Sequence, residues 1–100
     1  MIFKDLENLN LRWTLWIDGS GLAALKDNTK LQRLNLSQTA SGDKALSHIA
    51  HCTDMRRLEL WETQVTDNGL THLSKMKQLT WLDLKNTGIS NEGVAHLAEL

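Results

Sequence analysis

The hydrophobic residues of this chain change their spacing in a regular way. At residues 58–60 (Leu-Glu-Leu) apolar side chains occupy every second position, which predicts a strand with one buried face. From Asp67 the spacing widens, so that Leu70, Leu73 and then Met76 fall on one stripe of a helix. This stretch therefore predicts a strand followed by a short helix.

The same pattern recurs every 24 residues. Slid forward by 24, positions Met55, Leu58, Leu60, Thr63, Val65, Gly69, Leu70, Leu73 and Met76 fall on Leu79, Leu82, Leu84, Thr87, Ile89, Gly93, Val94, Leu97 and Leu100. An earlier copy precedes them, and a less regular one begins near residue 6. We predict a single domain, residues 1–100, with repeats at about 6–30, 31–54, 55–78 and 79–100.

The spacing Leu-x-x-Leu-x-Leu-x-x-Thr, followed by a short helical pattern, resembles the leucine-rich repeat. Residues 65–73 (VTDNGLTHL) are similar to the 24-residue subtype of bacterial and F-box-type proteins. The resemblance implies an α/β solenoid with a curved parallel sheet inside and short helices outside. The physical spacing of the elements favours the same curvature, because strands lie about 4.8 Å apart and packed helices about 8–10 Å apart.

The first repeat allows two registers. Aligning Leu9 with Leu34 places its strand near residues 9–11, whereas an alternative places the strand at residues 15–17. Terminal repeats are often atypical, so both registers stay open at this point.

Polar residues at the turns predict how the backbone is satisfied. Thr39, Thr63 and Thr87 follow the strands, and we expect their hydroxyls to bond backbone groups there. Thr66 and Ser90 are placed as helix N-caps. The second repeat lacks this residue, so we expect Asp43 to serve its helix start and the 38–44 loop to be the softest part of the middle.

Composition excludes several classes of function. The 100 residues carry 11 basic and 12 acidic side chains, and this net charge of −1 gives no support to nucleic-acid or membrane-surface binding. No apolar run approaches the roughly 20 residues of a membrane span, and the start lacks a signal-peptide stretch. One cysteine permits no internal disulfide, which favours a reducing, cytoplasmic location.

Side chains that alternate with the buried leucines should form columns on the concave side of the sheet, here called the sheet face. The columns are Asn8, Arg33, Arg57 and Trp81; then Asn10, Asn35, Glu59 and Asp83; then Arg12, Ser37, Trp61 and Lys85. Exposed tryptophan beside arginine is typical of interface hot spots. We therefore predict a protein-binding surface made of Arg33, Arg57, Glu59, Trp61, Trp81, Asp83 and Lys85. The alternative is internal pairing, with Arg57 stacked on Trp81 and balanced by Glu59, and both can hold at once.

Three histidines recur at the repeat interval, which raises the question of a metal site. Adjacent members of the column His48, His72 and His96 should lie about 10 Å apart. Zinc needs its nitrogen ligands at roughly 2.0–2.1 Å from one ion. No carboxylate or second histidine completes a set, so we predict no metal site.

The remaining residues predict no catalysis. Cys52 aligns with Met76 and should be a buried small hydrophobe. His51, which could activate the thiol, should face elsewhere on the helix. Glu59 and Asp83 sit on an open sheet and no phosphate-binding loop occurs, so we predict no catalytic residue, no cofactor and no enzyme.

Two functions remain. The favoured one is a protein-interaction module that binds a partner through the sheet face, as the resemblance also implies. The alternative is an assembly fragment of a longer repeat array that self-associates, as a homodimer, through an uncapped C-terminal edge. That edge would consist of Leu82, Leu84, Leu97 and Leu100.

Overall fold

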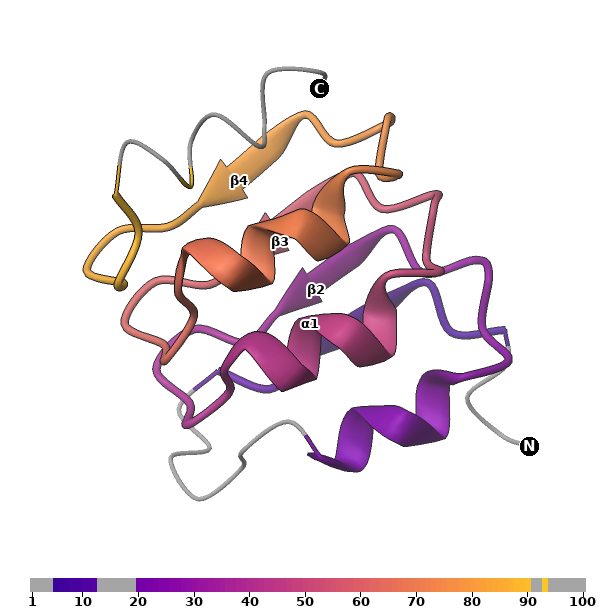
Figure 1. Cartoon of the computed structure of the whole chain (residues 1–100). Coiled ribbons are helices and arrows are strands. Elements are labelled where there is room, and N and C mark those ends of the chain that lie inside the picture. The colour runs from indigo at the N-terminus through magenta and orange to yellow at the C-terminus, as the bar shows by residue number, and fades with distance from the viewer. Residues whose placement is uncertain (1–4, 13–19, 91–92, 94–100) are drawn as a thin grey trace.

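Strands and short helices alternate along the chain in the computed structural model, which describes residues 5–12, 20–90 and 93 (Figure 1). The elements in order are β1 (Asn8–Asn10), η1 (Ser20–Leu25), β2 (Arg33–Asn35), α1 (Asp43–Ile49), β3 (Arg57–Glu59), η2 (Asp67–Leu73) and β4 (Trp81–Asp83). Among these residues, no helix has both the length and the apolar character needed to cross a bilayer.

The four strands form one parallel sheet in the order β1-β2-β3-β4. Leu9 lies opposite Leu34, and Leu34 lies opposite Leu58. The strand of the first repeat therefore has the register that places it near residues 9–11. The alternative strand at 15–17 lies outside the described residues.

The helices cover one side of the sheet, with α1 packed between η1 and η2 (Figure 1). The core fills the space between the two layers, and the leucine stripes predicted from the sequence, such as Leu70 and Leu73, are fully buried. The middle strands bury their central leucines almost completely, whereas Leu9 and Leu82 in the outer strands are only partly buried. Stacked repeats thus bury their apolar faces against each other.

The predicted helices are shorter and tighter than an α-helical stripe suggests. Of the three helices that lie within residues 20–90, α1 is an α-helix, while η1 and η2 are 3-10 helices of six and seven residues. The N–H of Gly69 donates to the carbonyl of Thr66 at 3.0 Å, which is the i→i+3 bond of this geometry. About two turns of this tighter helix are enough to place two leucines on the core.

Threonine satisfies the turn after each of three strands, as predicted. The hydroxyls of Thr39, Thr63 and Thr87 donate to the carbonyls of Leu36, Leu60 and Leu84 at 2.6, 2.7 and 2.6 Å. The residue before each threonine has a positive φ, at 59° for Gln38, 54° for Glu62 and 57° for Asn86. The hydroxyl bond therefore closes a turn whose backbone conformation non-glycine residues rarely adopt.

The N-cap prediction is confirmed for the position of Thr66 but not for a capping bond. Thr66 occupies the N-cap position of η2, but its side chain makes no bond to that helix. Its hydroxyl donates instead to the carboxylate of Asp43, and its backbone N–H donates to Asp43 Oδ1 at 2.7 Å. Asp43 lies in the first turn of α1, whose N-cap is Gly42, and its carboxylate bonds to the next repeat. Ser90 makes the same two bonds with Asp67, with its N–H at 2.7 Å.

Glycine is required beside each of these aspartates because the carboxylate occupies the space that a side chain would need. A Cβ at Gly69 would come within 3.0 Å of Asp43 Cγ, and one at Gly93 within 2.7 Å of Asp67 Cγ. We call each set an aspartate junction: Asp43 with Thr66 and Gly69, and Asp67 with Ser90 and Gly93. The recurring glycines are therefore close-packing positions between repeats.

The 38–44 loop carries several internal bonds. Ser41 is buried, and its hydroxyl donates to Thr39 Oγ1 at 2.8 Å, because the Thr39 proton goes to the Leu36 carbonyl. The Ser41 carbonyl accepts the Gln64 N–H at 2.8 Å, which ties the loop to the next repeat. That this loop is the softest part of the middle stays a prediction.

Candidate protein-binding face

The first column of the sheet face ends in an exposed aromatic residue. Pairing of β2 with β3 and of β3 with β4 aligns Arg33, Arg57 and Trp81 in one row across the sheet. All three are exposed, and Trp81 leaves 52% of its surface open to solvent. Among the described residues it is the one large hydrophobic side chain so exposed.

Arg57 connects this tryptophan to an acid. Its guanidinium carbon lies 4.6 Å from the ring centroid of Trp81, which is cation–π geometry, and its Nη2 donates to Glu59 Oε1 at 3.2 Å. The internal pairing considered as the alternative is therefore present. The contact with Arg57 holds the ring of Trp81 in place without burying it, so Trp81 is both paired with Arg57 and exposed to solvent.

Three of the four side chains in the second column form hydrogen bonds with the backbone, which the column pattern did not predict. The side-chain Oδ1 atoms of Asn10, Asn35 and Asp83 each accept the N–H two residues later, that of Arg12, Ser37 and Lys85, at 3.0 Å. Asp83, predicted to bind a partner, thus uses one carboxylate oxygen to close its own turn.

Repeat three replaces this local bond with one across repeats. Glu59 stands where the other strands carry asparagine or aspartate, and its carboxylate pairs with Arg57. The Trp61 N–H donates to Ser37 Oγ at 3.2 Å instead. Ser37 is fully buried, so its predicted place on the sheet face is wrong.

The third column also differs from expectation at its tryptophan. Trp61 is only partly exposed, with the guanidinium of Arg12 4.9 Å above its ring. Arg12 Nε donates further to Gln38 Oε1 at 3.1 Å. The expectation that both tryptophans are exposed is therefore confirmed for Trp81, whereas Trp61 is exposed only in part. Lys85, which is exposed, lies in the turn that follows β4.

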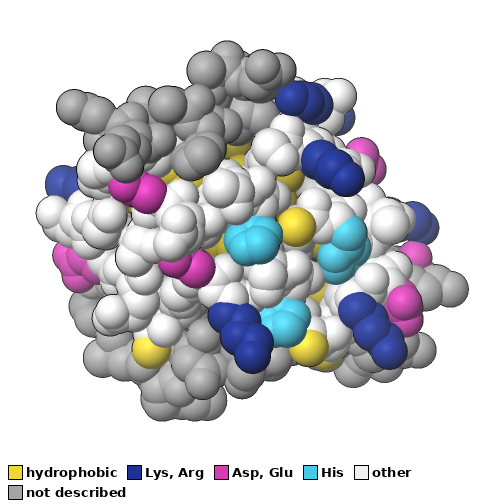
Figure 2. Space-filling view, in the orientation of Figure 1, with side chains coloured by type: hydrophobic (Ala, Val, Ile, Leu, Met, Phe, Trp, Pro, Cys, Tyr) yellow, Lys and Arg dark blue, Asp and Glu magenta, His cyan; other side chains and the backbone are white. Residues whose placement is uncertain are grey.

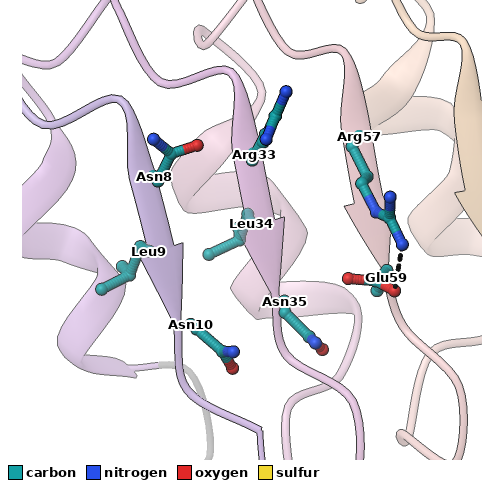
Figure 3. A pocket seen from close by; sticks show the side chains of 8 residues that line it. All are labelled: Asn8, Leu9, Asn10, Arg33, Leu34, Asn35, Arg57 and Glu59. Atoms are coloured by element: carbon teal, nitrogen blue, oxygen red, sulfur yellow. Dashed lines mark hydrogen bonds and ion pairs between the residues drawn. The ribbon is translucent and has the colours of Figure 1, made fainter.

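A polar hollow of about 370 Å³ lies on the β1–β3 part of the sheet face (Figure 3). Its lining residues are Asn8, Leu9, Asn10, Arg33, Leu34, Asn35, Arg57 and Glu59. The Arg33 guanidinium makes no hydrogen bond or ion pair within the described part of the chain, although the backbone N–H of Arg33 donates to the Glu7 carbonyl at 3.0 Å. The asparagines belong to the predicted columns but not to the predicted binding set, because an uncharged amide in one column carries no hot-spot signal.

The helix side carries the histidines, which gather near the middle of this face (Figure 2). His48 and His72 are partly exposed, and His96 lies outside the described residues. No group of three potential metal ligands occurs in residues 5–12, 20–90 and 93. A second hollow lies on the helix side, and its lining residues include His51 and His72.

His51 contacts Cys52, contrary to the expectation that it faces elsewhere. Its Nε2 lies 3.8 Å from Cys52 Sγ, but also 2.8 Å from the Leu25 carbonyl, which takes the ring N–H. The thiol donates to the Asn28 carbonyl at 3.6 Å. Burial raises the pKa of Cys52 from 9.0 to about 11. A protonated, fully buried thiol cannot act as a nucleophile near neutral pH.

Sequence reasoning missed the role of Asn28. It is buried, its Nδ2 donates to the Leu6 carbonyl at 2.8 Å, and its Oδ1 accepts the N–H groups of Lys30 and Leu31 at 2.7 and 2.8 Å. The available signal was an amide at the position where the next repeat has Cys52. Asn28 ties the first repeat to the second and is not a binding residue.

Comparisons with known proteins show the fold. No protein-family model and no curated protein matches the sequence. The structure is similar to an internalin from Listeria monocytogenes, with a TM-score of 0.75 and 28% identity over 97% of this chain and 27% of the internalin. It is also similar to actin-binding site 2 of leiomodin-1 (TM-score 0.71, 20% identity, 96% of this chain and 66% of that one). A third match is the tropomodulin C-terminal domain of Caenorhabditis elegans (0.64, 14%, 96% and 82%).

These likenesses and the four-stranded parallel sheet with its short helices identify an α/β leucine-rich-repeat solenoid. The chain spans about a quarter of the internalin that it matches. The 24-residue subtype and the repeat boundaries stay predictions.

Proposed function

We propose that this chain is a protein-interaction module that binds its partner through the sheet face. The exposure of Trp81, held in place by Arg57, is the observation that carries the proposal. The other predicted contact residues lie on β2 to β4 or just after them: Arg33, Glu59, Trp61, Asp83 and Lys85. Actin-binding site 2 of leiomodin-1 has a similar fold, which supports a protein-binding role but does not identify the partner.

The arrangement suits binding for a physical reason. An aromatic ring that is already fixed loses little conformational freedom when a partner covers it. Tryptophan and arginine are the residues that most often dominate interface energy. Trp81 therefore offers a large apolar contact at a small entropic cost.

The same proposal places the module in the cytoplasm and assigns it no catalysis. Its single cysteine is buried and protonated, which suits a reducing compartment. The solved structures that it resembles include an actin-binding site and no enzyme among those described above.

A pull-down from source lysate tests the proposal. Wild type and Lys44→Ala, a change on the exposed helix side, should retain the same partner. Trp81→Ala should weaken that binding by about 2 kcal/mol or more, which is the cost of losing a hot spot, while its melting temperature stays unchanged. A partner held equally by all three proteins would show that the sheet face is not the site.

A second candidate function follows from the edge of the sheet. Leu82 and Leu84 are partly exposed, whereas the corresponding Leu58 and Leu60 are fully buried under the next repeat. An edge strand with apolar neighbours favours stacking of another repeat or of a second copy. Leu97 and Leu100, predicted to share this edge, lie outside the described residues. Sedimentation as a strict monomer over a wide concentration range would exclude pairing of two copies.

A further inference from the structure

The sheet face has two chemically different ends. On β1 to β3 lies the polar hollow that contains Arg33, and on β4 lies the exposed ring of Trp81. Arg57 stands between them and is already paired with Glu59 (Figure 3). Glu59 is the one acidic residue that lines the hollow, and it is paired with Arg57. The positive charge of Arg33 therefore has no counter-charge in the hollow.

The polar groups that the hollow presents are mostly hydrogen-bond donors. Asn10 and Asn35 each use Oδ1 to accept a backbone N–H, which leaves the amide NH₂ as the group they turn outward. The guanidinium of Arg33 is a donor only. The Glu59 carboxylate is engaged by Arg57. A hollow of this composition suits an acceptor that carries negative charge.

The distance between the two ends sets a spacing for the ligand. Arg33 and Trp81 lie in the same row, two strands apart. Neighbouring strands are about 4.8 Å apart, so the two side chains are separated by about 10 Å. A peptide in the extended polyproline II conformation advances about 3.1 Å per residue with three residues per turn, so side chains three positions apart lie on the same side, about 9 Å from each other.

We propose that the sheet face recognises an extended acidic segment of a partner protein that runs across the strands. An aspartate or glutamate of the segment pairs with Arg33, and an apolar or aromatic side chain three positions away packs on Trp81. This inference rests on the proposed protein-binding function and specifies its ligand. It accounts for the guanidinium of Arg33, which has no partner among the described side chains, and for the exposed ring of Trp81, which lies two strands away in the same row.

Synthetic peptides test the recognition directly. Fluorescein-labelled 12-residue peptides in a Gly/Ser background would carry Asp-x-x-Phe, Lys-x-x-Phe, or Asp and Phe as direct neighbours. Anisotropy titrations should rank the Asp-x-x-Phe peptide first. Arg33→Gln should weaken its binding about five- to tenfold, because a charge-assisted hydrogen bond is lost. Lys44→Gln removes the same charge from the helix side and should leave binding unchanged.

A charge swap makes the test specific. Arg33→Glu should bind the Lys-x-x-Phe peptide better than the Asp-x-x-Phe peptide, and added salt should reduce both preferences. Equal binding of all three peptides by wild type, or no effect of Arg33→Gln, would overturn the inference. The inference would also be wrong if the wild-type chain formed a dimer that Arg33→Glu abolished. A second copy of the chain, and not an acidic segment, would then occupy the sheet face.

The two proposals fail in different ways. If binding of the lysate partner is weakened by Trp81→Ala but not by Arg33→Gln, the sheet face is the binding site and the proposal of an acidic ligand is wrong. If no partner depends on Trp81 and no peptide binds, the protein-binding function is wrong as well.

Discussion

The aspartate junctions and the sheet face use charged and polar groups in opposite ways. In the junctions, both oxygens of Asp43 accept bonds from Thr66, and a glycine leaves room for the carboxylate. On the sheet face, the Arg33 guanidinium has no partner among the described residues and Trp81 is half open to solvent. The carboxylate of Asp43 is thus hydrogen-bonded within the protein, whereas the Arg33 guanidinium and the Trp81 ring face solvent.

Comparison of the repeats with one another shows the same division. Asp43 and Asp67 occupy equivalent positions and make equivalent bonds to the next repeat. The row Arg33, Arg57 and Trp81 changes its chemistry from strand to strand. Positions that repeat their residue type hold the solenoid together, and positions that vary are the candidates for recognition.

The largest expected effect separates the core from the sheet face. Leu58→Ala should cost about 2–5 kcal/mol of unfolding free energy, because the side chain is fully buried between repeats. Glu59→Ala should cost about 1 kcal/mol or less, because it removes only a partly exposed ion pair. Urea denaturation of both variants measures the difference. Equal losses would contradict the observed strand register.

The aspartate junction gives the next largest effect. Gly69→Ala should cost about 1–3 kcal/mol, because the added methyl meets the Asp43 carboxylate. Gly42→Ala is the matched control, since its Cβ would lie 3.5 Å from Gln64, an ordinary contact. In the double variant Asp43→Ala/Gly69→Ala the two losses should be less than additive. Strict additivity in denaturation experiments would show that the carboxylate does not cause the requirement for glycine.

The buried thiol predicts a pH effect. The pKa of Cys52 is raised from 9.0 to about 11, so the folded state holds the proton more tightly than the unfolded state. Its contribution to stability is therefore complete below pH 9 and is lost as the pH rises towards 11. Thermal melts of wild type and Cys52→Ala should diverge in this window, with the wild type losing stability more steeply. Parallel curves would show that the thiol has the same pKa in both states.

The smallest expected effect lies at the turns. Glu62 has a φ of 54°, which costs less for asparagine than for glutamate. Glu62→Asn should therefore raise stability by up to about 1 kcal/mol. Glu62→Gln keeps the unfavourable preference and serves as the control. A destabilised Glu62→Asn protein in the same urea assay would show that the Glu62 side chain contributes more than its backbone costs.

The sequence predicts the strand register well, because alternation of leucine with polar residues decides which face each side chain occupies. This is why Arg33, Arg57 and Trp81 could be placed in one row before the structure was known. The turn threonines were predictable for a similar reason, since each follows its strand at a fixed offset.

Contacts between repeats were harder to predict. The period shows that Thr66 precedes a helix, but not that Asp43 of the previous repeat lies closer to its hydroxyl than the helix itself. In the same way, Trp61 is covered by Arg12, a residue 49 positions earlier whose side chain the column pattern cannot orient. Periodicity gives the direction of a side chain from its own strand and not the identity of its neighbour.

The most direct test of the central claim is an NMR footprint of the bound state. With ¹⁵N-labelled protein and the Asp-x-x-Phe peptide or the captured partner, the largest shift changes should occur at the Trp81 indole N–H and at the amides of β2 to β4. The amides of α1 and η2 on the helix side should stay within the noise. Shift changes centred on α1 and η2, with the Trp81 indole signal unmoved, would contradict binding through the sheet face.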